Sequence, residues 1–111
     1  PPMNLMAGDI TDGKLRIGEE PIAYDNLPHC GEVTIGLRPE DIVPDDGGDI
    51  TIDVTLVEEL GAHRLLHGTI AGQDISIHVD KDNLIDTGTL RVSLKPNAVS
   101  LFDATTGKRL T

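Results

Sequence analysis

VTIGLRPEDI, residues 33–42, is the stretch that decides how this chain folds. Its first half alternates apolar and polar side chains, which is the pattern of a β-strand with one buried face. Pro39 then ends the strand, because proline has no N–H group to donate to a neighbouring strand. Proline also suits the first position of a helix, and the carboxylates of Glu40 and Asp41 favour the positive end of the helix dipole. We therefore expect a buried strand that stops in a short acidic helical turn.

Short apolar runs separated by turn residues continue on both sides of this stretch. Asp12-Gly13 lies between two such runs and predicts a β-hairpin. Residues 18–31 lack a clear pattern, and their two prolines restrict them to an edge strand or a loop. Residues 43–49 combine a proline with two adjacent glycines and predict an acidic, turn-rich link.

The longest strand is predicted to begin at Ile50, with apolar side chains at every second position up to Leu56 on its buried face. Two more strands are expected at residues 90–94 and 98–102, on the same alternating pattern. No segment repeats its apolar residues at the helical period of about 3.6 residues. The sequence therefore predicts an all-β domain, a small barrel or sandwich of short antiparallel strands with one or two short helical turns.

One predicted hairpin of this domain brings two histidines together. Gly72 suits the first position of a two-residue turn, and that turn would pair Leu66 with Val79. The same register places His67 directly opposite His78 on the outer face, where two imidazoles can share a metal ion. A convincing third ligand is missing, and structural zinc sites use four, so an exposed polar pair is the favoured interpretation. No metal site is predicted.

Composition and charge narrow the functional classes. The chain has 111 residues, enough for one domain, and its single cysteine cannot form an internal disulfide, which fits a reducing compartment. The formal net charge is -10, and eight Asp or Glu residues but no Lys or Arg lie between Arg38 and Arg64. Such a surface repels a phosphate backbone, and Tyr24 and Phe102 are the only aromatic side chains, so no nucleic-acid partner is predicted. The same charge argues against an anionic ligand.

Catalytic patterns are absent from the sequence. A phosphate-binding loop needs glycines followed by Lys and Ser or Thr, whereas Gly107-Lys108 is followed by Arg109. Glu58 and Glu59 are neighbours on a predicted strand, so their carboxylates point to opposite faces instead of converging. No nucleophile motif is present. We therefore expect no catalytic residue and no bound cofactor in this chain.

Four blocks together resemble the C-terminal regulatory domain of ABC-importer ATP-binding subunits of the maltose and glycerol-3-phosphate transporter type. They are PPMNL at residues 1–5, the GLRPE motif within residues 35–42, VEELG at residues 57–61 and LFDATTGKRL at residues 101–110. The motif positions are Gly36, Arg38, Pro39, Glu40, Glu58, Leu60, Gly61, Leu101, Phe102, Asp103 and Gly107. We interpret these residues as structural, with Phe102 as an anchor in the core.

The resemblance implies a transport-associated, OB-type (TOBE, MOP-like) barrel over residues 1–111, with lead-in strands and a loop in 1–31 and the main barrel in 32–111. The parent subunit would hydrolyse ATP, and its ATP and Mg2+ site would lie in a domain upstream of this chain. The chain itself would be a non-catalytic regulatory and dimerisation domain. Its implied partners are a second copy of the subunit, the membrane subunits of the transporter and, in some members, a regulatory protein.

The same resemblance implies a peripheral position on the cytoplasmic face of the inner membrane. No apolar run approaches the roughly 20 residues that span a bilayer, so membrane association would require a partner. The start at Pro1-Pro2-Met3 is expected for a piece of a longer chain. Two alternatives from other classes remain. One is a small-ligand-binding barrel for a sugar or an oxyanion, and the other is a nucleic-acid-binding barrel, against which the charge argues.

Overall fold

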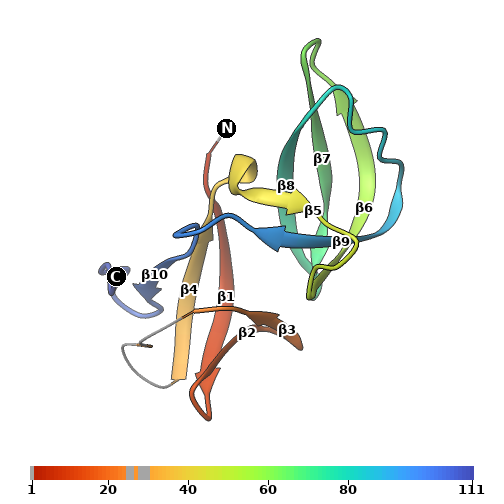
Figure 1. The fold of residues 1–111 in the computed structure, drawn as a ribbon. Helices are drawn as coiled ribbons and strands as arrows, with labels where there is room; N and C mark the ends of the chain where they lie inside the picture. Colours follow the sequence, from red (N-terminus) through yellow and green to blue (C-terminus); the bar gives the residue numbers. More distant parts are fainter. Residues whose placement is uncertain (1, 25–26, 28–30) are drawn as a thin grey trace.

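The computed structural model describes residues 2–24, 27 and 31–111. Within these residues the regular structure is β-strand, as predicted, apart from one turn of 3-10 helix, and no helix is long and apolar enough to cross a membrane (Figure 1). The elements in chain order are β1 (Asn4–Thr11), β2 (Lys14–Ile17), β3 (Glu20–Ile22), β4 (Gly31–Leu37), η1 (Pro39–Asp41), β5 (Ile42–Pro44), β6 (Ile50–Glu59), β7 (His63–Ile70), β8 (Gln73–Asp80), β9 (Gly88–Leu94) and β10 (Ser100–Asp103).

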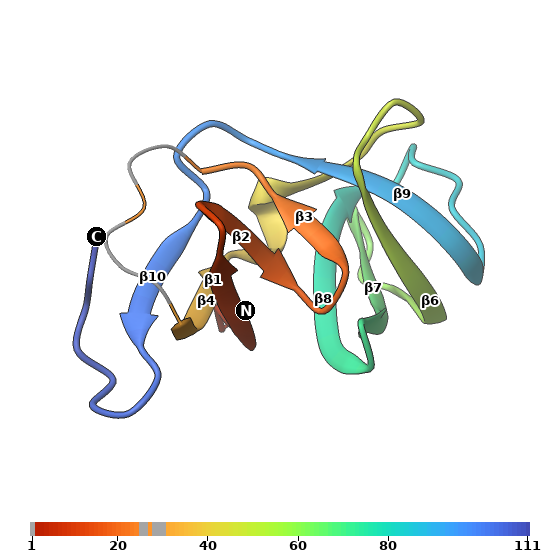
Figure 2. The same ribbon diagram turned by 90° about the horizontal axis from the view of Figure 1, so that it is seen from below.

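The strands form two five-stranded sheets in which all neighbours are antiparallel. The first sheet has the order β10-β4-β1-β2-β3, and the second has the order β5-β9-β6-β7-β8. Both sheets curl around one apolar core and together form a half-barrel (Figures 1 and 2). This is the small, OB-like, all-β fold that the sequence predicts.

The VTIGLRPEDI stretch supplies an inner strand of the first sheet. Its strand, β4, pairs with β1 on one side and β10 on the other, and its alternate apolar side chains are buried. The strand ends at Leu37, and the helical turn η1 begins at Pro39, which is buried. The N–H of Asp41 donates to the carbonyl of Arg38 at 3.0 Å and closes the turn. The predicted strand and turn are therefore both confirmed.

The first three strands belong to the same sheet as β4 and β10. β1 pairs with β4 along its length, from Asn4 opposite Leu37 to Ile10 opposite Gly31. β2 and β3 continue this sheet, and Pro21 lies in the edge strand β3, as its missing N–H requires. The other proline predicted to restrict this region, Pro28, lies outside the described residues. Hydrogen bonding thus places the strands before residue 32 in one sheet with strands that follow it.

Side-chain amides join the two sheets where β1 passes β8. Asn4 Nδ2 donates to the carbonyl of Ser76 at 2.8 Å, and Asn4 Oδ1 accepts from the N–H of Ser76 at 2.9 Å. Gln73 makes the reciprocal pair from β8, since its Oε1 accepts from the N–H of Ala7 at 2.8 Å and its Nε2 donates to the Ala7 carbonyl at 2.9 Å. Each amide replaces a missing ladder partner for a peptide group of the other sheet. These two contacts are termed the amide clamps below.

A β-bulge in β6 makes one prediction about its faces wrong. The strand is the longest described, as predicted, and Val54 is buried as expected. The ladder to β7 then shifts its register between Val54 and Leu56, so Thr55 is an extra residue on β6. Leu56, which simple alternation assigns to the buried face, is 57% exposed, and Val57 packs against the core instead.

The hairpin of β7 and β8 has a register two residues away from the predicted one. Its turn residues are Ala71 and Gly72, so Leu66 pairs with Ile77 instead of Val79. Both turn residues have positive φ, 48° and 78°, as a type I′ turn requires. A shift of two residues keeps every side chain on its own face. The buried face of β8 is therefore as predicted, although its partners on β7 are not.

The acidic link predicted for residues 43–49 begins with a short strand. β5 pairs with β9, with Pro44 opposite Val92. β5 is an edge strand of the second sheet, which is where a proline is tolerated. The turn itself follows at Asp45, whose Oδ1 accepts from the N–H of Gly47 at 2.9 Å and whose carbonyl accepts from the N–H of Gly48 at 2.8 Å. The prediction of a turn-rich link is thus wrong only for Val43 and Pro44, which belong to β5.

Candidate functional site

The glycine of the GLRPE motif is packed under the side chains of Met3 and Phe102. Gly36 on β4 is buried and lies opposite Ser100 of β10. A Cβ atom at Gly36 would overlap the sulfur of Met3 and would lie 3.1 Å from a ring carbon of Phe102. The side chains of Met3 and Phe102 therefore occupy the space that a side chain at position 36 would need.

The remaining motif residues build the turn that follows β4. Pro39 is buried, whereas the side chains of Arg38 and Glu40 are exposed and form no ion pair with any described residue. The turn η1 contacts β8, and the carbonyl of Asp41 accepts from the N–H of Lys95 at 2.9 Å. The turn thereby ties the end of β4 to the end of β9.

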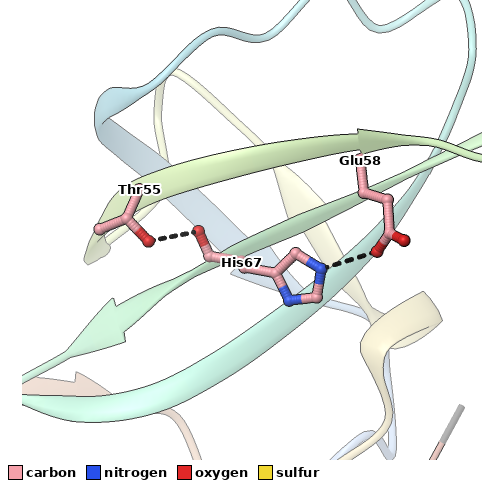
Figure 3. Close-up of polar contacts among 3 residues, drawn as sticks. All are labelled: Thr55, Glu58 and His67. Atoms are coloured by element: carbon pink, nitrogen blue, oxygen red, sulfur yellow. Dashed lines mark hydrogen bonds and ion pairs between the residues drawn. The ribbon is translucent and has the colours of Figure 1, made fainter.

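The two glutamates of the VEELG motif point to opposite faces of β6, as predicted. Glu58 Oε1 lies 3.0 Å from Nε2 of His67 on the outer face of the second sheet (Figure 3). On the opposite face, Glu59 Oε1 lies 3.3 Å from Nε of Arg64, whose side chain is only 17% exposed. This second contact lacks hydrogen-bond geometry, so it acts as an ion pair. The two carboxylates therefore cannot act on one substrate atom.

Leu60 and Gly61 of this motif belong to the turn between β6 and β7. The N–H of Leu60 donates to the carbonyl of His63 at 2.9 Å, and Gly61 has a φ of 81°, in the left-handed region. At the bulge, Thr55 Oγ1 donates to the carbonyl of His67 at 3.2 Å (Figure 3). Leu60 is 50% exposed and faces solvent.

His67 and His78 do not face each other. In the observed register His67 lies opposite Ser76, and His78 lies opposite Leu65. The ring of His78 instead lies near that of His63, with 4.5 Å between centroids and an interplanar angle of 45°. The predicted cross-strand pair is wrong because the turn is placed one residue earlier than expected. Among the described residues, no three His, Cys, Asp or Glu side chains are grouped to hold a metal ion.

The LFDATTGKRL block begins with β10 and then makes a tight turn. Asp103 Oδ1 accepts from the N–H groups of Thr105 and Thr106, both at 2.8 Å. The N–H of Gly107 donates to the carbonyl of Asp103 at 2.9 Å, and Gly107 has a φ of 74°. Asp103 and Gly107 therefore fix the turn that reverses the chain.

The reversal brings Arg109 back over β10. Leu101 is fully buried, whereas Phe102 is only half-buried, so Leu101 is the core anchor of this block and the prediction for Phe102 is wrong. Phe102 pairs with Arg109 in an antiparallel bridge, and the guanidinium carbon of Arg109 lies 5.6 Å from the centroid of its ring. This distance suits a cation–π contact.

A cleft that sequence reasoning missed lies beside this arginine. Its volume is about 960 Å³, and it is lined by β2, β3, β9, residues 95–99 that lead to β10, and the end of the chain. Four cationic side chains line it, those of Lys14, Arg16, Lys95 and Arg109. The overall acidity of the chain argues against an anionic ligand, but the charged side chains that line this cleft are mainly cationic. No sequence spacing predicts it, because its residues come from three distant parts of the chain.

Comparison with known families explains the motifs. A model of the TOBE domain matches residues 35–102, which is more than half of the chain. The chain belongs to the TOBE-domain family. The match begins in β4 and ends in β10, so it contains the GLRPE motif, the VEELG motif and the start of the C-terminal block.

Curated relatives align with almost the whole of this TOBE domain. The "sn-glycerol-3-phosphate import ATP-binding protein UgpC" of Jannaschia sp. (strain CCS1) is 48% identical over 113 residues, covering 99% of this chain and 32% of that protein. The protein of the same name from Ruegeria pomeroyi is 39% identical over 114 residues, with the same two shares. The "Diacetylchitobiose uptake system ATP-binding protein MsiK" of Streptomyces coelicolor is 30% identical over 139 residues, covering 100% of this chain and 37% of that protein. The chain thus spans about a third of the length of these relatives.

Proposed function

We propose that this TOBE domain is the non-catalytic regulatory and dimerisation domain of the ATP-binding subunit of an ABC importer for glycerol 3-phosphate or a carbohydrate. The observation that carries the proposal is the alignment of 99% of the chain with about a third of an import ATP-binding protein. The relatives from three genera all carry names of import or uptake ATP-binding proteins. A shared segment of this extent supports a shared role within the subunit.

The chemistry of the described residues supports a non-catalytic role. Glu58 and Glu59 point apart, and the motif residues Gly36, Pro39 and Asp103 all stabilise the backbone. Acid–base catalysis requires groups that converge on one substrate. We therefore assign ATP, Mg2+ and hydrolysis to the part of the subunit outside this chain, and no cofactor to the chain itself.

The partners and the location follow from this assignment. The domain contacts a second copy of the ATP-binding subunit, and it reaches the membrane subunits of the transporter through the rest of its own subunit. A regulatory protein is a further partner. The complex places the domain on the cytoplasmic face of the inner membrane as a peripheral component. Its net charge of -10 disfavours nucleic acid as a partner.

The proposal is tested in the intact ATP-binding subunit, with and without residues 1–111. Sedimentation velocity measures dimerisation, and uptake by the assembled transporter measures transport. We expect the shortened subunit to hydrolyse ATP but to dimerise more weakly and to transport less. Leu101→Ala in the intact subunit is a second variant, because it damages the core of the domain without shortening the chain. Unchanged dimerisation and transport in the shortened subunit would overturn the proposal.

A small-ligand-binding module is the second candidate function, and the cationic cleft is the observation that favours it. This function is compatible with a regulatory domain, because a ligand that binds one conformation better shifts the equilibrium towards it. The two candidate functions are tested by different measurements. Ligand binding is measurable on this chain alone, whereas dimerisation and transport are measured on the intact subunit.

A further inference from the structure

Two histidine rings meet on the outer face of the β7–β8 hairpin. His63 on β7 pairs with Asp80 on β8, and His78, two residues earlier on β8, pairs with Leu65. His63 and His78 are therefore diagonal neighbours on one face, a separation that aromatic side chains can bridge. Their ring centroids lie 4.5 Å apart at an interplanar angle of 45°. Imidazole is a common ligand of divalent transition metals, so two rings this close are a candidate chelating pair.

Both rings have nitrogen atoms that an ion can reach. Among the described residues, His67 is the only histidine whose ring forms a hydrogen bond, and its partner is Glu58 (Figure 3). The side chain of His63 is 50% exposed, and His78 is partly buried. Neither ring of the pair is therefore occupied by a hydrogen-bond partner within the described part of the chain.

A carboxylate beside one of these rings determines which of its nitrogens can bind the ion. Oδ1 of Asp80 lies 3.8 Å from Nδ1 of His63. In metal sites a carboxylate commonly stands beside one nitrogen of a histidine, because it favours a proton on that nitrogen and leaves the other as the ligand. This position assigns Nε2 of His63 as the metal-binding atom. The net charge of -10 also raises the local concentration of cations.

The pair supplies two protein ligands and no more. Within the described residues, no group of three His, Cys, Asp or Glu side chains is placed to hold a metal ion. Water must therefore complete the coordination, and the ion is held less tightly than in zinc sites with three or four protein ligands. A site of this kind exchanges its ion with solution and supplies no catalytic group to the chain.

We propose that His63 and His78 bind a divalent transition-metal ion, with Cu2+ bound more tightly than Ni2+ or Zn2+. This order is the general preference of nitrogen ligands. The pair lies at the end of the hairpin away from its turn at Ala71 and Gly72. An ion at this end joins β7 to β8 and closes the loop of chain between them, so it opposes separation of the two strands. The inference goes beyond the proposed function and does not depend on it.

Metal binding is measured on the 111-residue chain by calorimetry and by thermal unfolding, with and without EDTA. All variants carry His29→Asn and Cys30→Ser, because an adjacent imidazole and thiol in the sequence also favour these metals. Cu2+, Zn2+ and Mg2+ are added separately. We expect saturating Cu2+ to raise the Tm by at least about 4 °C, Zn2+ to raise it less, and EDTA to reverse both shifts. Mg2+ prefers oxygen ligands and should leave the Tm unchanged.

Single substitutions test whether the two histidines act as a pair. His63→Asn and His78→Asn should each weaken Cu2+ binding at least tenfold, because each removes one of the two protein ligands. His67→Asn is the matched control, since this histidine lies on the same strand as His63 but its ring contacts Glu58. It should leave the affinity unchanged. Circular dichroism without metal checks that each variant is folded.

Three results would overturn the inference. Absence of heat and of a Tm shift with Cu2+ at about 1 mM would exclude a site of useful affinity. Equal weakening by His67→Asn and His78→Asn would show that the histidines bind the ion without forming this pair. Equal stabilisation by Mg2+ and Cu2+ would show that the acidic surface attracts the ions and that the imidazoles do not select them. None of these measurements involves dimerisation or transport, so the proposed function is tested separately.

Discussion

Replacing Asn4 by alanine removes one of the two amide clamps and should destabilise the domain by about 2 kcal/mol. Its two hydrogen bonds with Ser76 have lengths of 2.8 and 2.9 Å, and each contributes about 1 kcal/mol net. The contact is partly buried, so water only partly replaces the lost amide. Gln73→Ala removes the same number of bonds at an exposed position and should cost about 1 kcal/mol.

Isosteric substitutions separate hydrogen bonding from packing. Asn4→Asp keeps an acceptor for the N–H of Ser76 but places a second oxygen against the carbonyl of the same residue. We therefore expect Asn4→Asp to destabilise the domain at least as much as Asn4→Ala. Gln73→Glu has the same defect at the carbonyl of Ala7 and should also be no better than its alanine variant.

Urea unfolding followed by far-ultraviolet circular dichroism is the appropriate measurement, because the chain has no tryptophan and a single tyrosine. In thermal unfolding followed by the same signal, a loss of about 2 kcal/mol should lower the Tm by about 8 °C in a domain of this size. Asn83→Ala is the matched control, since this asparagine is exposed and its side chain has no hydrogen bond with a described residue. Equal unfolding free energies for Asn4→Ala and Asn83→Ala would refute the role of the clamp.

Three further pairs or single substitutions test the close approach of two strands, the packing of the core and the surface charge. Each is measured as a change in the free energy of unfolding in the same assay. Gly68→Ala should destabilise the domain by more than about 2 kcal/mol, because a Cβ at this position would overlap the carbonyl of Asp53 on β6. Gly47→Ala is the control and should change the stability by less than about 1 kcal/mol, because a Cβ there would make only ordinary contacts. Leu101→Ala should destabilise the domain by about 2–5 kcal/mol, because Leu101 is fully buried. Leu84→Ala should change the stability by no more than about 0.5 kcal/mol, because Leu84 is 83% exposed. Similar losses for both variants would contradict the burial argument. Glu58→Gln should cost less than about 1 kcal/mol, because the contact of Glu58 with His67 is exposed to solvent, and a larger loss would show an unrecognised role.

Local patterns predicted most of the strands, because alternation and turn residues act over a few positions. Where the prediction failed, the geometry of a single residue decided the outcome. Thr55 has no feature that identifies it as the bulge residue, yet it moves Leu56 to solvent and Val57 to the core. Ala71 takes a φ of 48°, which is unusual for alanine, so the turn was predicted one residue too late. A sequence pattern alone does not reveal which residue accepts such strain.

The candidate site was predicted less well than the fold, since binding sites depend on contacts between distant residues. The motif positions were identified from the sequence and interpreted as structural, and the structure adds the individual packing and turn contacts that they make. The histidine pair was lost with the register error, because His78 lies near His63 instead of His67. The net charge of -10 gave no sign that four cationic side chains line one cleft.

The GLRPE motif and the LFDATTGKRL block are in contact where β4 lies next to β10. This contact gives a structural reason for motif residues that lack a reactive side chain. Gly36 on β4 leaves room for the ring of Phe102, and that ring supports the guanidinium of Arg109. Arg109 in turn lines the cleft. A Cβ at position 36 would overlap the sulfur of Met3 and approach a ring carbon of Phe102 to 3.1 Å, so these two side chains would have to move slightly. The glycine of the first motif therefore lies beside the ring that carries one cation of the cleft, although it does not line the cleft itself.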